Sequence, residues 1–106
     1  MVIFSEIFVS ELIGIQLVDA VQEKIGRVKD IIIILGETFP KVSGLLISIE
    51  QKKELAVLIG EIEVIGNKFI STRSPKKQVP LTTLREGEIL LMRDVMDQQV
   101  VDLEGA

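Results

Sequence analysis

The chain has 106 residues, of which 47% are hydrophobic and only four are aromatic, and its formal net charge is -4. A net negative charge argues against nucleic-acid binding, because contacts with phosphates need a basic surface. The sequence contains no Cys and no His, which excludes a thiolate metal site and removes the most frequent general base. We therefore expect one small domain that is not an enzyme and that holds no cofactor or metal.

The apolar segments are too short to cross a membrane as helices. The longest unbroken aliphatic run spans only residues 31–35, whereas a membrane helix needs ~20 apolar residues. Glu6 and Glu11 interrupt the N-terminal apolar stretch, and this argues against a signal peptide. A cytoplasmic protein without membrane insertion is the expectation.

Ile, Val and Leu supply most of the apolar residues in the first half of the chain, and these residue types favour pleated, half-buried surfaces. Residues 7–9 are expected to form a lead-in strand. A short helical turn follows, which Ser10 caps and Gly14 ends. Turn-forming residues then separate short apolar runs, which predicts strands at 17–19, 25–35, 42–49 and 54–59.

The second half of the chain continues this spacing. Gly66-Asn67 stands between apolar residues and favours a two-residue hairpin turn, because both residue types tolerate positive φ. The returning strand is predicted at 69–72, and a loop with two prolines follows. Residues 90–98 are predicted to form a short helix.

The run 31–35 is apolar on both faces of its strand. Ile31, Ile33 and Leu35 face one way, and Ile32 and Ile34 face the other. Such a strand is normally covered on both sides. Cover from the same chain is the favoured interpretation, and an exposed patch that binds a partner is the alternative. The candidate interaction residues of this strand and of the terminal helix are Ile31, Ile33, Leu35, Leu90, Leu91 and Val95.

Three further residues have interpretable local roles. Gly26 permits a bulge or sharp bend, Asp19 can accept backbone N–H groups across the adjacent turn, and Asp30 can fix the end of a strand. The order Ile25-Gly26-x-Val28-x-Asp30 resembles the core pattern of the PRC-barrel family, which is related to the H subunit of the photosynthetic reaction centre and to a ribosome maturation factor. The resemblance implies a mostly β fold: a small PRC-type β-barrel of about six short antiparallel strands with a short C-terminal helix.

The same resemblance suggests how the chain is organised. Residues 1–9 would be the lead-in strand and residues 10–98 the barrel. The segment 91–102 resembles the join to a second PRC-like half in bacterial proteins that also carry CBS-type domains and MgtE-type magnesium-transporter N-terminal domains. Residues 99–106 would then begin a second, truncated repeat.

The leading functional hypothesis is a non-catalytic protein-interaction or regulatory module. It would bind a protein partner or a neighbouring domain, or form a homo-oligomer, within a larger cytosolic protein related to the regulation of magnesium transport. The alternative is an adaptor barrel in RNA processing or ribosome assembly, which would use the basic loop residues Arg73, Lys76 and Lys77. The acidic residues near the C-terminus are interpreted as a solvated face and not as a cation site.

Overall fold

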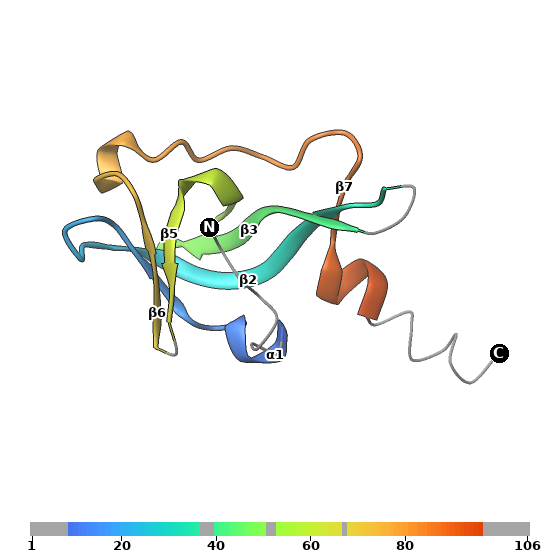
Figure 1. Cartoon of the computed structure of the whole chain (residues 1–106), viewed down its shortest axis with the longest axis horizontal. Coiled ribbons are helices and arrows are strands. Elements are labelled where there is room, and N and C mark those ends of the chain that lie inside the picture. Colours follow the sequence, from blue (N-terminus) through green and yellow to red (C-terminus); the bar gives the residue numbers. More distant parts are fainter. Residues whose placement is uncertain (1–8, 37–39, 51–52, 67, 97–106) are drawn as a thin grey trace, which may run out of the picture.

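The computed structural model describes residues 9–36, 40–50, 53–66 and 68–96. Seven strands form one curled sheet with the order β4-β3-β2-β1-β6-β5, and β7 pairs with β2 outside this path. The sheet bends into a half-barrel around an apolar interior (Figure 1). The mostly β fold expected from the sequence is confirmed. Within the described residues, no helix is long and apolar enough to cross a membrane.

The chain enters the sheet through a short helix. Helix α1 spans Val9–Leu12, and Gly14, with φ of +89°, ends the turn that follows it. The helical turn was expected, and Ser10, predicted at its start, lies within the described range of α1. Residues 1–8, which include most of the predicted lead-in strand, lie outside the described part of the chain. Strand β1 then spans Gln16–Val18.

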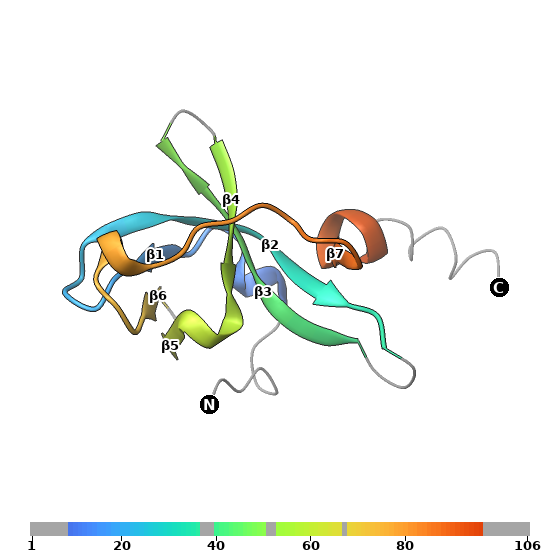
Figure 2. The same cartoon turned by 90° about the horizontal axis from the view of Figure 1, so that it is seen from above.

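Strand β2, Lys24–Ile34, is the longest element and crosses the whole molecule (Figure 2). One edge pairs along most of its length with β3, Lys41–Ile49. The other edge pairs first with β1 and then with β7, Glu88–Leu90. The two halves of β2 therefore have different neighbours, and this difference positions the site described below.

The middle of the chain closes the curl. Strand β4 spans Lys53–Leu58, a 3-10 turn spans Ile59–Glu61, and strand β5 spans Ile62–Ile65. Strand β6, Phe69–Thr72, matches the predicted range. It runs parallel to β1, so the expectation of a purely antiparallel barrel is wrong at this pair. The long connection through β2 to β5 allows the chain to return in the same direction as β1.

The β5–β6 hairpin differs in detail from the prediction. The N–H of Gly66 donates to the carbonyl oxygen of Phe69 at 2.9 Å, so these two residues flank the turn and it begins one residue later than Gly66-Asn67. Gly66 is not among the positive-φ residues. Instead, a Cβ at this position would lie 3.2 Å from the Phe69 carbonyl oxygen.

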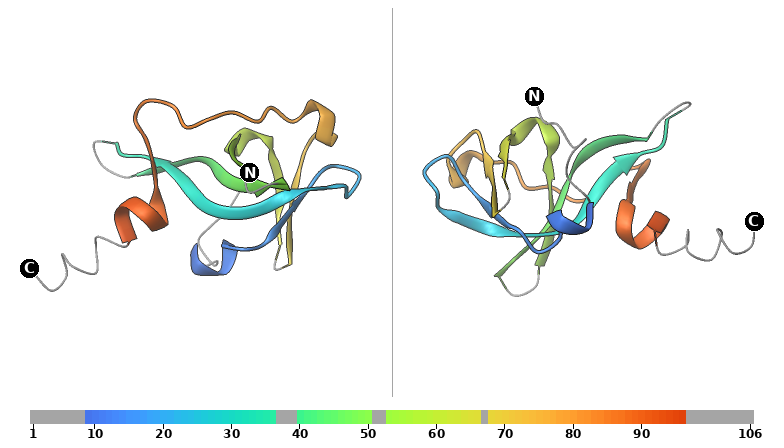
Figure 3. Two further views of the ribbon diagram at one scale, coloured as in Figure 1. Left: turned by 180° about the vertical axis from the view of Figure 1, so that it is seen from behind. Right: turned by 60° about the horizontal axis from the view of Figure 1, so that its bottom comes forward.

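The C-terminal helical segment spans Leu91–Met96 and has π-helical geometry. Leu90, expected as its first residue, belongs to β7 because it pairs with Ile32. The segment lies at the end of the molecule opposite the β5–β6 hairpin (Figure 3). The proposed second repeat at residues 99–106 lies outside the described residues.

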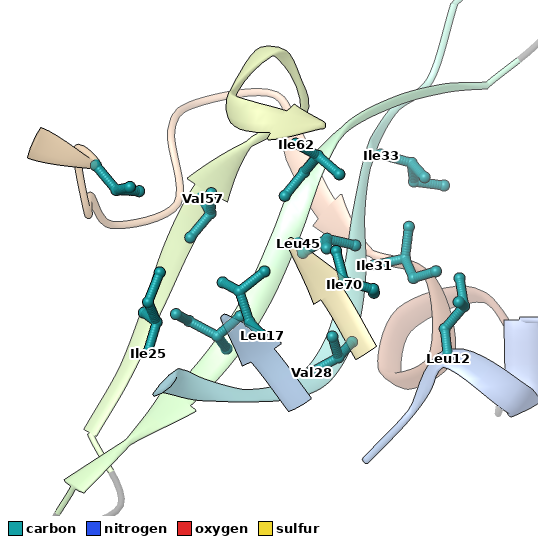
Figure 4. Packing of buried hydrophobic residues seen from close by; sticks show 12 residues of the cluster. Leu12, Leu17, Ile25, Val28, Ile31, Ile33, Leu45, Val57, Ile62 and Ile70 are labelled. Atoms are coloured by element: carbon teal, nitrogen blue, oxygen red, sulfur yellow. The ribbon is translucent and has the colours of Figure 1, made fainter. Parts of the chain in front are cut away.

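The main core fills the inside of the curl. Side chains from β1, β2, β3, β4 and β6 point toward one another there, among them Leu17, Val28, Leu45 and Ile70 (Figure 4). A smaller cluster lies on the outer face of the sheet, where Ile32, Leu46, Ala56 and Leu90 are buried together.

Both faces of the run 31–33 are thus covered by the same chain. Ile31 and Ile33 belong to the main core, and Ile32 belongs to the outer cluster. Cover from the same chain, the favoured interpretation for the run 31–35, is therefore present at these three residues, whereas Ile34 is 39% and Leu35 62% exposed.

Candidate functional site

Asp19 follows β1 and is only 1% exposed. Its carboxylate accepts N–H groups from Val21 at 2.9 Å, from Glu23 at 2.7 Å and from Lys76 at 2.7 Å. Burial opposes ionisation, but these hydrogen bonds outweigh it and hold the pKa of Asp19 below its usual value. The expected turn role is present, and the bond to Lys76 adds a tie between the turn and the basic loop.

Asp30 lies midway along β2 and is 5% exposed. One of its oxygens accepts the N–H groups of Ile31 at 2.7 Å and of Met92 at 2.8 Å, and the other accepts that of Arg93 at 3.1 Å. The free N–H groups of the first helical turn need such acceptors. Asp30 therefore fixes the start of the terminal helix rather than the end of its own strand.

Gly26 of β2 is buried beside Ser48 and Ile49 of β3. A Cβ at this position would lie 2.5 Å from the carbonyl oxygen of Ser48, which only glycine avoids. The β1–β2 register shifts between Leu17 and Val18, which pair with Gly26 and Lys24. The predicted bulge is therefore present, and Ile25 is the extra residue.

The candidate interaction residues are distributed between core and surface. Ile31, Ile33 and Leu90 are at most 3% exposed, so they stabilise the fold and offer no surface to a partner. Leu91 and Val95 are half-buried and pack against the main core. Of the six candidates, Leu35 alone is exposed, at 62%.

The basic loop 73–80 does not gather its cations into one site. The guanidinium of Arg73 lies 3.6 Å from the carboxylate of Glu63, and both side chains are more than half exposed. Arg73 also lines a hollow with Phe69, so the structure places an aromatic ring beside the loop, which the sequence order concealed. Lys76 instead lines a different hollow with Lys24.

A hollow with a volume of about 480 Å³ lies along the first half of β2. Lys24, Arg27 and Lys29 line it together with Ser48 of β3. Ile13, after α1, and Ile49 of β3 supply apolar surface. We call this hollow, defined by Ile13, Lys24, Arg27, Lys29, Ser48 and Ile49, the cationic groove.

The bulge at Ile25 explains how three cations come together. In a regular strand Arg27 and Lys29 share a face, whereas Lys24 would point to the other. Lys29 is itself the extra residue at a second register shift, between β2 and β3. The extra residue at Ile25 turns the side chain of Lys24 to the same face of the strand as those of Arg27 and Lys29. Arg27 is further held by its Nη1, which donates to the carbonyl oxygen of Gly14 at 2.9 Å.

The charge of the cationic groove is opposite in sign to the net charge of the whole chain. Three cations line it, and no carboxylate of the described residues is among its lining residues. The chain as a whole carries a net charge of -4. Next to the groove in the sheet register lies Glu54 of β4, which pairs with Ser48. The charge of Glu54 also acts on Arg93. A hollow with this lining suits an anionic ligand.

Sequence reasoning missed the cationic groove. Lys24, Arg27 and Lys29 were not among the predicted site residues, and the basic candidates Arg73, Lys76 and Lys77 all belong to the loop 73–80. A usable signal was present: three basic residues within six positions of one strand around a glycine bulge.

Two acidic residues of the second half, Glu88 and Asp94, are engaged with the protein itself, whereas Asp97, Asp102 and Glu104 lie outside the described residues. Glu88 accepts the hydroxyl of Ser43 at 2.7 Å and the N–H of Arg85 at 2.8 Å. Asp94 accepts the N–H of Leu90 at 2.9 Å, and the hydrogen bond from Arg93 is the main cause of its lowered pKa. In the described part of the chain, no cluster of acidic side chains has the arrangement of a metal site.

Comparison with known proteins adds no relative: no family model matches the chain, and no curated protein and no solved structure is significantly similar to it.

Proposed function

We propose that this chain is a non-catalytic protein-interaction module that binds an acidic segment of a partner protein in the cationic groove. The observation that carries the proposal is the lining itself: Lys24, Arg27 and Lys29 around one hollow without a carboxylate among the described lining residues. A partner of opposite charge is attracted over a longer range than an uncharged one, and its acidic groups replace water around the three cations.

The apolar part of the lining supports a protein partner over RNA. Ile13 and Ile49 flank the cations, and aliphatic surface suits the side chains of a peptide. Single-stranded nucleic acid is usually held by aromatic stacking as well as by charge, and none of the described groove residues is aromatic. The one aromatic ring beside basic residues, Phe69, shares its hollow with Glu63, whose charge repels phosphate.

The wider setting is a proposal that rests on the sequence resemblance. We infer that the half-barrel is a PRC-type barrel within a cytosolic bacterial protein related to the regulation of magnesium transport. Gly26 at a bulge and Asp30 at the start of the terminal helix support a structural role for the motif residues. The acidic segment could then belong to a neighbouring domain of that protein.

The test is a binding titration with a labelled peptide of alternating Asp and Glu, followed by fluorescence anisotropy at several salt concentrations. The triple variant K24E/R27E/K29E is expected to bind about tenfold more weakly, because three ion pairs of ~0.5 kcal/mol each are lost. Binding by the unmodified protein should weaken as salt rises, since the screening length is only about 8 Å at 0.15 M.

The matched control is K41E/K53E/K68E, which makes the same change in net charge at exposed lysines outside the groove. Equal weakening by both triple variants would show that only overall charge matters and would overturn the proposal. A single-stranded RNA of the same length is titrated in parallel. If the groove variant lowers RNA binding and the peptide binds more weakly than RNA, the adaptor function replaces the proposed one.

A further inference from the structure

A second hollow, with a volume of about 310 Å³, adjoins the cationic groove at its Lys24 end. Lys24 and Ile49 line both hollows, so the two share a wall. Ile25 and Leu81 add apolar surface to the second one, and Lys76 and Glu50 complete its lining. We call this hollow, defined by Lys24, Ile25, Ile49, Glu50, Lys76 and Leu81, the anchor pocket.

Contacts far apart in the sequence hold the apolar wall of the anchor pocket in place. Thr82 exchanges two backbone hydrogen bonds with Ala56, at 2.7 and 2.9 Å, and so fixes the adjacent Leu81. The bond from the Lys76 N–H to the Asp19 carboxylate fixes the opposite side. A wall that is ordered before binding loses little conformational freedom when a ligand arrives.

Leu81 remains 36% exposed although the fold positions it firmly. An apolar side chain that entered beside Leu81 and Ile49 would remove apolar surface from water on both partners, which favours association. Lys24 and Lys76 line the pocket together with one carboxylate, that of Glu50. The cations outnumber the carboxylate, which favours acidic residues beside such a side chain on the side of Lys24.

We propose that the acidic segment bound in the cationic groove carries one apolar residue at the end of its acidic run, and that this residue seats in the anchor pocket. This inference rests on the proposed function and narrows its ligand class. The geometry assigns the order of the acidic run and the apolar residue along the bound segment. From Lys24 to Lys29 the strand advances less than about 16 Å, because the bulge at Ile25 takes up one position, so an acidic run of at most about five extended residues spans the cations. The anchor pocket lies beyond Lys24.

Two labelled peptides of identical composition test the inference: one with a single Leu at the end of an acidic run of about five residues, and one with the Leu in its middle. The unmodified protein is expected to bind the terminal-Leu peptide about tenfold more tightly, the low end of what burial of one Leu side chain contributes. Leu81→Ala should abolish this preference and leave the affinity for a Leu-free acidic peptide within about twofold.

The control variant is Leu35→Ala, which removes the same side chain from an exposed site directly after the end of β2, away from both hollows, and it should retain the full preference. Equal affinity of the two peptides for the unmodified protein, or a preference that survives Leu81→Ala, would overturn the anchor pocket. If either of these outcomes is found but K24E/R27E/K29E no longer binds the peptides, the anchor pocket is overturned and the proposed function stays intact. Unchanged binding in that triple variant would overturn both.

Discussion

The two halves of β2 differ in what lies on the outer face of the sheet. In the first half, Lys24, Arg27 and Lys29 face an open groove. In the second half, Ile32 is 1% exposed beneath Leu90 and its neighbours. The outer face of one strand thus lines the proposed binding surface along one part and a second core along the other. The comparison teaches that an open charged surface and a buried cluster can follow each other on one face of a single element, with Asp30 at the boundary.

The largest expected effect is in the second half. Ile32→Ala should lower the free energy of unfolding by about 3 kcal/mol, because it leaves a cavity in the outer cluster. Ile34→Ala is the matched control: it lies two residues on in the same strand but is 39% exposed, so a loss below ~1 kcal/mol is expected. Urea denaturation measures both. Equal losses would mean that the outer cluster contributes nothing beyond ordinary strand residues.

A smaller loss in the free energy of unfolding is expected at Asp30, the boundary between the two halves of β2. Asp30→Ala removes the acceptor for three backbone N–H groups and should cost about 2 kcal/mol. Amide hydrogen exchange at Met92 and Arg93 should become faster, because the helix start loses its cap. Lys29→Ala, at the exposed neighbouring position, should leave exchange unchanged. Unaltered protection of both amides in the Asp30 variant would contradict the capping role.

The third prediction concerns acid stability near β7. Burial opposes ionisation of Glu88, but hydrogen bonds from Arg85 and Ser43 hold its pKa below the usual 4.5. As the pH falls, Glu88 is therefore protonated in the unfolded chain before it is protonated in the folded protein. The stabilisation by Glu88 is present above pH 4.5 and is lost as the pH falls through the folded-state pKa.

The measurement for Glu88 is the denaturation midpoint at several pH values between 3 and 7. Glu88→Gln should lower stability at pH 7 by about 1 kcal/mol and should flatten the decline in acid. Glu86→Gln, at an exposed neighbour, should do neither. A variant at Glu88 that loses stability as steeply as the parent below pH 4.5 would show that other carboxylates dominate.

The smallest effect on stability is expected in the first half. Arg27→Ala loses only the exposed hydrogen bond to Gly14, so the free energy of unfolding should change by no more than about 0.5 kcal/mol. Thermal unfolding followed by circular dichroism measures this. A loss above 2 kcal/mol would mean that the groove is a structural feature, and the separation between the two halves of β2 would disappear.

Much of the local structure could be predicted because the signals lie between neighbours in the chain. The range 69–72 matched β6, and β1 to β4 appeared within one or two residues of their expected bounds. The terminal helix was placed one residue early, since Leu90 looks equally suitable for a helix face and for β7. Leu90 belongs to β7 because it pairs with Ile32, which lies 58 positions earlier in the sequence (90 − 32). No local sequence pattern reveals this pairing.

The candidate site was less predictable. Asp19 was expected to bind its own turn, and it does, but its bond to Lys76 spans 57 positions. The cationic groove needs a bulge that brings Lys24 into phase with Arg27, and the anchor pocket needs Leu81 held by a bridge to Ala56. Residue types alone do not reveal such arrangements.

By itself, the sequence determined the mostly β character, the turns and the two-sided run 31–33, because side-chain alternation and turn chemistry act over a few residues. The tertiary structure alone decided which face of that run became the outer cluster, what Asp30 caps and where the cations meet. Those outcomes depend on contacts between segments up to 63 positions apart, and the curl of the sheet selects them when the core closes.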